Sequence, residues 1–444
     1  MAPHKLLIVS YFFPPTAAAG SFRMLGFARH LPQLGWRTVV VAPPRLPFEP
    51  VDRELGEQIP PETVVYPVLN PEGLAWKVVR KALGPYSVWL TRALGACTRA
   101  VRDHRPDAVL TTGPPHLVHL LGLVLKRRYG LPWVADFRDP WITKDEGTPT
   151  CGNLGSRRSL RRRWLTRLER AVIEQADVIA STGPLATRKL CESFPQQRSK
   201  MVTLTNGYDP ERFEPGDSPA AAGGPVRIVH AGELYAGRDP GPFLDAIRDV
   251  VSGDGPGPGR GSVQVRFFGQ NPGGFDFPAE IRHRGLETIV ETPGQVPYTQ
   301  ALREMSRSDI LLLLDSPGRR VGVPAKIYEY LGAGRSILAL GEADGDLAWV
   351  LRESGVPHRI APLKDAAAIR QALIELIGEL RSGRAVAAEA RRHPVFTREA
   401  IARRLVSILE SLAAPAETAA APAAGDRACP TLGPSPQSEP VQVR

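Results

Sequence analysis

Residues 5 to 42 indicate the fold class: they read KLLIVSYFFPPTAAAGSFRMLGFARHLPQLGWRTVVVA. Lys5 to Ser10 is apolar on both faces, which is typical of a buried parallel strand. A helical pattern runs from Phe22 to Leu34 and ends at Gly35, a residue suited to a helix C-terminus. Thr38 to Ala42 is a second, β-branched strand. A strand, a helix and a strand within forty residues form a βαβ unit, which predicts a parallel sheet.

Strand and helix patterns alternate along the rest of the chain. The expected strands are Ala108–Thr112, Trp133–Phe137, Val178–Ser181, Met201–Thr205, Arg227–Ala231, Val263–Phe268, Ile289–Glu291, Ile310–Leu314 and Ser336–Leu340. The expected helices are Leu117–Arg128, Leu160–Gln175, Pro240–Val251, Tyr298–Ser306 and Ala325–Ala333. Residues 214–225 have no periodic apolar pattern, so we interpret them as an interdomain linker. The sequence therefore predicts an α/β protein with two Rossmann-like, doubly wound parallel-sheet domains facing a cleft.

The linker sets the expected domain boundaries. The first domain is 1–215 and the second is 216–396, with a surface loop at 253–261. An amphipathic helix, 397–412, follows the second domain, and we expect it to return to the first. In the tail, 413–444, 15 of 32 residues are Ala or Pro. Such a tail cannot bury enough apolar surface to offset the entropy of ordering, so we expect it to be disordered.

The composition limits the class of protein. Of the 444 residues, 43% are hydrophobic and 23% are charged, which excludes a wholly disordered chain and a small disulfide scaffold. The cysteines are scattered and form no CxxC pair, so neither a zinc site nor a disulfide framework is expected. They are Cys97, Cys151, Cys191 and Cys429. Sparse cysteine use suits a reducing compartment, which predicts a cytoplasmic protein.

The chain contains no apolar run long enough for a membrane-spanning helix. Leu6 to Phe13 resembles the apolar part of a signal peptide, but Ser10 and Pro14-Pro15 interrupt the pattern, and we favour the nucleotide-fold strand. The net charge of +10 is local, because Arg157 to Arg170 holds seven arginines and one glutamate, a net +6. Two interpretations of this segment remain open. Either its arginines contact an anionic membrane surface, or its apolar side packs on the first domain and the arginines are solvated.

Nucleic-acid binding is not expected, because the basic segment has little aromatic interleaving beyond Trp164. An anionic membrane surface at the inner face is thus the macromolecular contact considered for this segment, and the alternative that its arginines are simply solvated stays open.

Candidate site residues of the first domain follow its strands, since ligands of open α/β sheets bind at the carboxyl ends of strands. The small-residue loop Tyr11–Arg23 leads into a helix, where backbone N–H groups can approach a phosphate. Its single glycine, Gly20, makes this a weak motif. Asp136, Arg138 and Asp139 crowd three charges after one strand. They are either site residues or an ion cluster that holds the loop.

His116 comes directly after another strand, in the run Gly113-Pro-Pro-His. It can contact a substrate hydroxyl near neutral pH or cap the following helix, where His119 also lies. In the second domain, Arg238 lies in a glycine-bordered loop and suits a phosphate oxygen. Lys326 and Glu329 are three residues apart, so they share one helix face. They form either a ligand site or an ordinary i,i+3 salt bridge.

The order of these segments resembles family 4 of the retaining glycosyltransferases, which have the two-domain GT-B architecture. The resemblance covers residues 5 to about 412. The segments that carry it are YFFPPTAAAGSFRMLGFARHL, PWVADFRDPW, NGYDPERF, HAGELYAGRDP and VPAKIYEYLGAGRSILAL. The first and the last are the most specific when they occur together.

The resemblance implies roles for particular residues. Gly20 matches the glycine that faces the donor diphosphate and the reacting sugar. Arg238 falls where the family usually has a phosphate-binding lysine, Lys326 occupies a phosphate-facing position, and Glu329 matches the glutamate that holds the donor ribose. The implied catalytic-side residues are His116, Arg138 and Asp139, with His116 supplying an imidazole.

The sequence also departs from the family at three positions. Val321 stands eight residues before Glu329, where the family has its first glutamate. Glu233 stands where an arginine is common, and Arg138 occupies the place of the usual histidine. These departures put the contacts to the donor sugar in doubt.

The resemblance implies transfer of a sugar from a nucleotide diphosphate sugar, with UDP favoured, to an acceptor hydroxyl that is lipid-linked in many members. The anomeric configuration would be retained. No cofactor or metal is expected, and no DxD-like pair lies in a suitable loop. Two alternatives remain: a nucleotide-sugar 2-epimerase on the same fold, and a catalytically inert binding partner in which Val321 marks the loss of activity.

Overall fold

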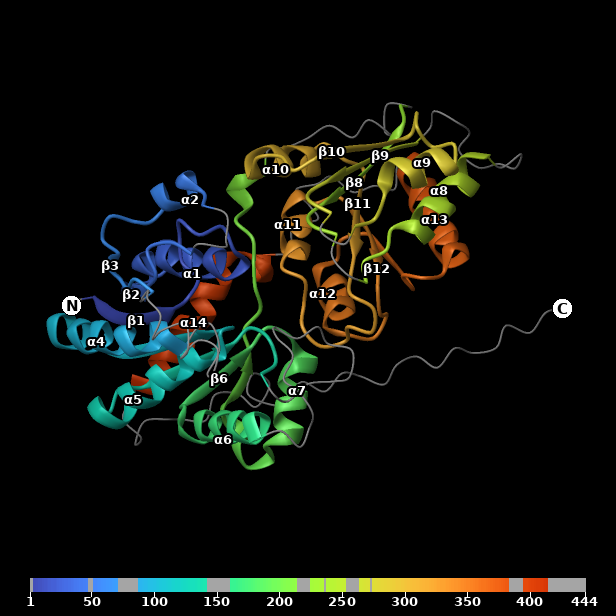
Figure 1. Ribbon diagram of the computed structural model, residues 1–444. Coiled ribbons are helices and arrows are strands. Elements are labelled where there is room, and N and C mark those ends of the chain that lie inside the picture. The colour runs from blue at the N-terminus through green and yellow to red at the C-terminus, as the bar shows by residue number, and fades with distance from the viewer. Residues whose placement is uncertain are drawn as a thin grey trace.

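The computed structural model describes residues 3–46, 51–70, 87–141, 160–213, 224–234, 237–252, 263–271, 274–382 and 394–413. These residues form two parallel sheets covered by helices on both faces (Figure 1). The first sheet has the strand order β3-β2-β1-β4-β5-β6-β7 and the second has the order β10-β9-β8-β11-β12-β13. Every pairing in both sheets is parallel. The predicted fold class is confirmed.

The described residues of the first unit form seven strands. They are β1 (His4–Ser10), β2 (Trp36–Ala42), β3 (Val64–Pro67), β4 (Ala108–Gly113), β5 (Trp133–Phe137), β6 (Val178–Ser181) and β7 (Met201–Thr203). The α-helices described here are α1 (Ala19–His30), α2 (Arg53–Glu57), α4 (Ser87–His104), α5 (His119–Tyr129), α6 (Leu160–Gln175) and α7 (Pro184–Ser193). Short 3₁₀ turns are η1 (Pro32–Leu34), η2 (His116–Val118), η3 (Pro195–Lys200) and η4 (Pro210–Arg212).

In the second unit, the part of the chain that the structure describes forms six strands. They are β8 (Val226–Ala231), β9 (Val263–Phe268), β10 (Val290–Gly294), β11 (Ile310–Leu314), β12 (Ser336–Leu340) and β13 (His358–Ala361). Its α-helices in the described ranges are α8 (Gly241–Ser252), α9 (Phe277–His283), α10 (Tyr298–Ser306), α11 (Lys326–Ala333), α12 (Asp346–Ser354) and α13 (Ala366–Arg381). The turn η7 (Pro394–Phe396) then leads into α14 (Arg398–Ala413).

The central strands are buried on both faces, as their apolar runs predict. Leu6, Leu7, Ile8 and Val9 of β1 are fully buried between β2 and β4. In the second unit β11 is buried along its whole length. Both faces of each sheet are covered by helices, so a ligand cannot reach the sheet from either face. A site can therefore form only in the loops at the carboxyl ends of the strands.

The last helix, α14, packs on the first unit. Its residues Leu405 and Leu409 share one apolar core with Leu6 and Phe27. Figure 1 shows α14 in red against the blue elements of the amino-terminal half. The chain therefore crosses between the two units a second time.

Some boundaries differ from the expected ones. The first helix begins at Ala19 rather than Phe22 and ends at His30, and η1 then continues to Leu34. Gly35 has a φ of 81°, which explains why a glycine stands there. The elements β3, β13, α2, α4, α7, α9, α12 and α13 were not expected. The short, exposed strand β3 lacks a regular apolar pattern, whereas α13 carries one at helical spacing and was missed despite it.

Several expectations fall outside the described residues. These are the linker core 214–223, the loop 253–261 and the tail from residue 414 onward. Among the helices that the structure describes, none is both long and apolar enough to cross a membrane.

Candidate functional site

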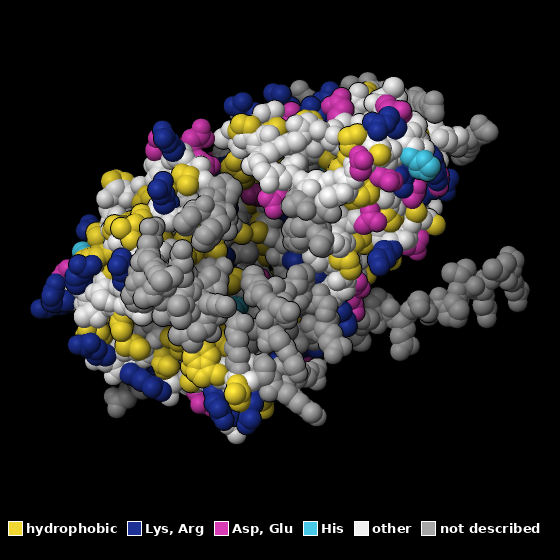
Figure 2. All heavy atoms as spheres, in the orientation of Figure 1, with side chains coloured by type: hydrophobic (Ala, Val, Ile, Leu, Met, Phe, Trp, Pro, Cys, Tyr) yellow, Lys and Arg dark blue, Asp and Glu magenta, His cyan; other side chains and the backbone are white. Residues whose placement is uncertain are grey.

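The loops at the carboxyl ends of the strands of both units meet at a cleft, seen as a hollow between the two halves in Figure 2. A pocket of about 180 Å³ lies at this junction. It is lined from the first unit by Phe22 of α1 and from the second by Lys326 and Glu329 of α11. Arg398, the first residue of α14, forms a further wall.

Lys326 is the most unusual cation of this pocket. Its Nζ atom is buried and has no hydrogen-bond partner within the part of the chain that the structure describes. It lies against the backbone of Gly232, where a Cβ atom would overlap it. Burial, followed by the nearby charge of Arg238, lowers the pKa of Lys326 to about 7. A buried cation beside another cation is a favourable place for an anion such as a phosphate.

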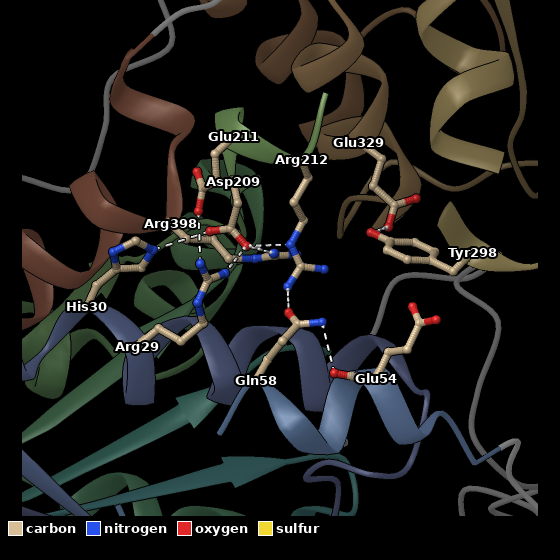
Figure 3. A network of polar contacts seen from close by, with 10 residues as sticks. All are labelled: Arg29, His30, Glu54, Gln58, Asp209, Glu211, Arg212, Tyr298, Glu329 and Arg398. Carbon is tan, nitrogen blue, oxygen red and sulfur yellow. Dashed lines mark hydrogen bonds and ion pairs between the residues drawn. The ribbon is translucent and has the colours of Figure 1, made fainter. Parts of the chain in front are cut away.

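Glu329 lies one helical turn after Lys326, as its spacing predicts. Its Oε1 atom accepts a hydrogen bond of 2.9 Å from the hydroxyl of Tyr298 on α10 (Figure 3). Burial raises the pKa of Glu329, and the Tyr298 hydrogen bond opposes this shift. The i,i+3 salt bridge that was the alternative is not formed, since Lys326 Nζ has no partner in the described residues.

A second pocket of about 180 Å³ opens next to Lys326. Phe267, Gly269 and Gly294 line it at the carboxyl ends of β9 and β10, together with Gly232 after β8. A Cβ atom on Gly269 would overlap the carbonyl group of Gly232, so the glycine keeps these two loops close. The walls combine an aromatic ring with backbone, which suits a flat ring with polar edges.

On the first unit, Gly20 lies at the amino terminus of α1 and contacts Arg138. A Cβ atom on Gly20 would lie 2.8 Å from Cζ of Arg138. Arg138 donates a 2.8 Å hydrogen bond from Nη2 to the carbonyl of Pro114. The predicted residues Gly20 and Arg138 are therefore brought together at the end of β5, with the Pro114 loop beside them.

Asp136 does not take part in a cluster with Arg138. It is fully buried and forms a two-point ion pair with Arg23 of α1, at 3.0 and 2.9 Å. Thr112 donates to the same carboxylate at 2.9 Å. Arg23 also donates to the carbonyl of Leu204 at 3.0 Å. This ion pair joins α1, β4, β5 and the segment after β7, so the role of Asp136 is structural. The carboxylate expected to pair with Arg138 pairs with Arg23 instead.

Asp139 follows Arg138 and is exposed. Within the described ranges its carboxylate forms no hydrogen bond or ion pair. An exposed carboxylate beside Arg138 is free to contact a ligand, so its catalytic role stays a prediction.

His116 begins the turn η2 and packs in an aromatic cluster. Its ring stacks on Trp141 with centroids 5.3 Å apart and planes at 15°. His119 behind it is fully buried, with Nδ1 at 2.8 Å from the hydroxyl of Thr111. Burial, then the charge of Arg138, lowers the pKa of His119 to about 3, so this ring is neutral. The structure keeps His116 at a strand end but does not place it in the pocket with Lys326.

Val321, the position of the missing family glutamate, is buried in a small apolar cluster with Leu185 and Ala186 of α7. Asp346 lies beside it at the amino terminus of α12. Its carboxylate accepts hydrogen bonds from the backbone N–H groups of Leu185 at 2.7 Å, Ala186 at 3.2 Å and Gly322 at 2.8 Å. Two of these donors belong to the first unit. Asp346 therefore joins the two units, a contact that sequence reasoning missed.

A network of basic side chains surrounds the buried carboxylate of Asp209, beside the first pocket (Figure 3). Its partners are Arg29 at 3.1 Å, His30 at 3.2 Å, Arg212 at 3.2 Å and Arg398. Burial alone would raise the pKa of Asp209, but these groups hold it below its ordinary value. The network fixes the start of α14 against α1. It was also missed, although NGYDPERF was noted as a motif.

The segment Arg157–Arg170 is described from Leu160 onward. Leu165 and Leu168 of α6 pack on the core of the first unit. Trp164 and Leu160 instead remain 41% and 81% exposed. Leu165 and Leu168 thus agree with the interpretation in which this segment packs on the first domain, whereas the exposed Trp164 does not.

Across the described ranges, no three His, Cys, Asp or Glu side chains gather closely enough to hold a metal ion. Arg238 is buried beside Lys326 and Asp315, so the predicted donor-side residues Arg238, Lys326 and Glu329 lie together.

Comparison with known proteins bears on the fold and on a family for part of the chain. Residues 20–207 match the family described as "Glycosyl transferase 4-like domain". The solved structure of sucrose-phosphate synthase from Thermosynechococcus elongatus superposes with a TM-score of 0.65 at 14% identity, over 92% of this chain and 99% of that one. The fold is GT-B.

Two further GT-B structures are similar to this chain. HepE from Anabaena, solved in complex with UDP-glucose, has a TM-score of 0.61 at 14% identity over 92% of this chain and 99% of its own. A putative UDP-N-acetylglucosamine 2-epimerase from Listeria monocytogenes has a TM-score of 0.53 at 12% identity, over 93% and 96%. No curated protein matches the chain significantly in sequence. The family match supports a glycosyltransferase, and the solved structures show the shared GT-B fold.

Proposed function

We propose that this protein is a retaining glycosyltransferase that transfers a sugar from a nucleotide diphosphate sugar to an acceptor hydroxyl. The observation that carries the proposal is the buried Lys326 ammonium, which lies beside Arg238 without a hydrogen-bond partner in the described residues. The match of residues 20–207 to the glycosyl transferase 4-like family supports the same activity.

The donor is proposed to lie across the second unit. Its base enters the pocket at Phe267 and Gly269, and its diphosphate lies against Lys326 and Arg238. Glu329 then accepts hydrogen bonds from the ribose hydroxyls. We favour a uridine nucleotide, in line with the complex of the similar HepE with UDP-glucose.

In the proposed reaction the bond between the anomeric carbon and the β-phosphate oxygen breaks, and a bond from the acceptor oxygen to that carbon forms. The leaving phosphate gains negative charge, which Lys326, Arg238 and the amino terminus of α1 at Gly20 can stabilise. The acceptor proton passes to the leaving phosphate. Retention of configuration and independence of a metal are taken from the resemblance to family 4. His116, Arg138 and Asp139 remain the proposed residues on the acceptor side.

The acceptor is proposed to be lipid-linked, and the enzyme to attach to the inner face of a membrane through α6. The exposed Trp164 supports this, because an aromatic ring beside arginines suits a lipid headgroup region. Arg163 and Arg167 are exposed on the same helix.

The proposal is tested with a panel of nucleotide sugars, by measuring nucleotide release with membrane lipid extracts as acceptors. The anomeric configuration of the product is then read by NMR. Lys326→Ala should remove release, and Lys364→Ala, at an exposed lysine of the same unit, should not. An epimer formed from the donor alone would indicate the 2-epimerase instead. The absence of both turnover and nucleotide binding would indicate an inert protein.

A further inference from the structure

Tyr298 joins the two halves of the pocket. Its hydroxyl lies 2.9 Å from Oε1 of Glu329, and its ring lies against Phe22 of α1 with centroids 5.2 Å apart. Phe22 and Glu329 both line the pocket. In Figure 3 the Tyr298 hydroxyl and the Glu329 carboxylate point toward one another. A single side chain therefore contacts the ribose-binding candidate on one side and the first unit on the other.

The direction of the hydrogen bond follows from chemistry. Burial, followed by the charge of Glu329, raises the pKa of Tyr298 above its ordinary value, so the phenol keeps its proton. The hydroxyl therefore donates and the carboxylate accepts. A carboxylate has two oxygens, and in the described residues only Oε1 of Glu329 is engaged by a hydrogen bond. Oε2 remains available to accept from a ligand.

Within the described ranges, four elements direct titratable or charged groups toward Glu329. They are α10 with Tyr298, α14 with Arg398, α11 with Lys326 and η4 with Arg212. Burial raises the pKa of Glu329, whereas the Tyr298 hydrogen bond and then the three positive charges lower it. Of the four groups, Tyr298 is the one that forms a hydrogen bond with the carboxylate.

We propose that Tyr298 is the positioning residue of the donor site, whose hydroxyl holds Oε1 of Glu329 and thereby orients the carboxylate so that Oε2 can accept from the ribose hydroxyls. This inference rests on the proposed function, since it assigns Glu329 to the nucleotide. Phe22 holds the tyrosine ring in place from the opposite wall. Nothing in the sequence pattern of Tyr298–Ser306 distinguishes the tyrosine from a residue that packs on the core.

The test compares Tyr298→Phe with wild type by calorimetric titration of UDP, GDP, ADP and dTDP between pH 5 and pH 9. The phenylalanine keeps the ring contact and removes only the donor. The acid limb of the affinity profile should move to higher pH by about one unit, because a hydrogen bond to a charged group is lost. The matched control is Tyr66→Phe, which removes a 3.1 Å hydrogen bond to the exposed Asp103, away from the cleft. Its profile should equal that of wild type.

An acid limb that stays in place in Tyr298→Phe overturns the proposal. If none of the four nucleotides binds wild type, the proposed function fails, and the pair is tested without a ligand. A double-mutant cycle of Tyr298→Phe and Glu329→Ala, read from the thermal midpoint at pH 7, should then show a smaller combined shift than the sum of the single shifts. Additive shifts would overturn the Tyr298–Glu329 link itself.

Discussion

The guanidinium group of Arg138 occupies the space that a side chain at residue 20 would need. A Cβ atom on Gly20 would lie 2.8 Å from Cζ of Arg138 and closer still to one of its nitrogens. Arg138 is held from the other side by the carbonyl of Pro114. The absence of a side chain at Gly20 is thus what lets an arginine from the end of β5 reach the amino terminus of α1.

Gly20→Ala is expected to lower turnover at least tenfold while changing the thermal midpoint by only a few degrees. The added methyl group must displace the guanidinium, which is the mobile end of its side chain, and leaves the backbone in place. Kinetics and thermal unfolding check this. The control is Gly95→Ala in α4, where nothing lies within 4 Å of the new atom, and it should stabilise the protein by about 0.5–1 kcal/mol. A Gly20→Ala enzyme with normal turnover would show that Arg138 has no part in the reaction.

Lys326 is expected to take up a proton when the diphosphate binds. Its pKa of about 7 leaves it mostly neutral at pH 8, and a bound anion restores the charge. Calorimetry at pH 8 in buffers of different ionisation heat should give an uptake of about one proton per nucleotide. Lys326→Arg should abolish the uptake, since a guanidinium keeps its proton.

The lowered pKa of Lys326 also makes the stability of the fold depend on pH. The pKa of Lys326 is lower in the folded state than its ordinary 10.5. The buried lysine therefore destabilises the fold fully below pH 7, and this destabilisation fades as the pH rises toward 10.5. Lys326→Met should therefore raise the thermal midpoint at pH 7 and lose this advantage near pH 10. Lys364→Met, at an exposed lysine, should show no such trend.

Asp346→Ala is expected to loosen the contact between the two units. The change leaves the N–H groups of Leu185 and Ala186 without their acceptor, at a cost of about 1–3 kcal/mol each where they stay buried. Small-angle X-ray scattering should show a larger radius of gyration. Asp365→Ala removes a carboxylate that caps α13 within the second unit, so it should lower stability without changing the radius. Equal radii for both variants would contradict the link.

Asp139→Asn is expected to lose turnover with little change in stability, because the carboxylate is exposed beside Arg138. Asp136→Asn should instead destabilise the fold by about 3–5 kcal/mol, since it breaks the buried ion pair with Arg23. Thermal unfolding and kinetics on both variants separate the two roles. An Asp139→Asn protein that melts lower and turns over normally would assign the residue to structure.

Arginine-to-serine changes on α6 are expected to release the protein from anionic vesicles. Arg163, Arg167 and Arg170 are exposed, and each contributes about 1 kcal/mol near an anionic surface. Co-sedimentation with anionic and neutral liposomes at low and high salt measures this. The control variant carries serine in place of three arginines that are exposed on the second unit, Arg282, Arg307 and Arg370. Equal pelleting with both kinds of vesicle, or no loss in the α6 variant, would exclude attachment through this helix.

The sequence predicts the elements whose residues act locally. The apolar run Lys5–Ser10 is a strand in the structure because both of its faces are buried. The pairing of Lys326 with Glu329 follows from the helical repeat, which needs only their spacing. The edge strand β3 was missed, since its exposed valines lack the pattern of a buried strand.

The amino-acid sequence by itself thus determined the two βα series, the fold class and the loops that carry the candidate site. Only the tertiary structure decided which polar and charged groups contact one another. Arg23 pairs with Asp136 across 113 residues, and Asp346 accepts from Leu185 across 161. Tyr298 reaches Glu329 from a different helix. Local patterns specify secondary structure because they depend on neighbours in the chain, whereas such partners are chosen by how distant segments pack, which no spacing in the sequence encodes.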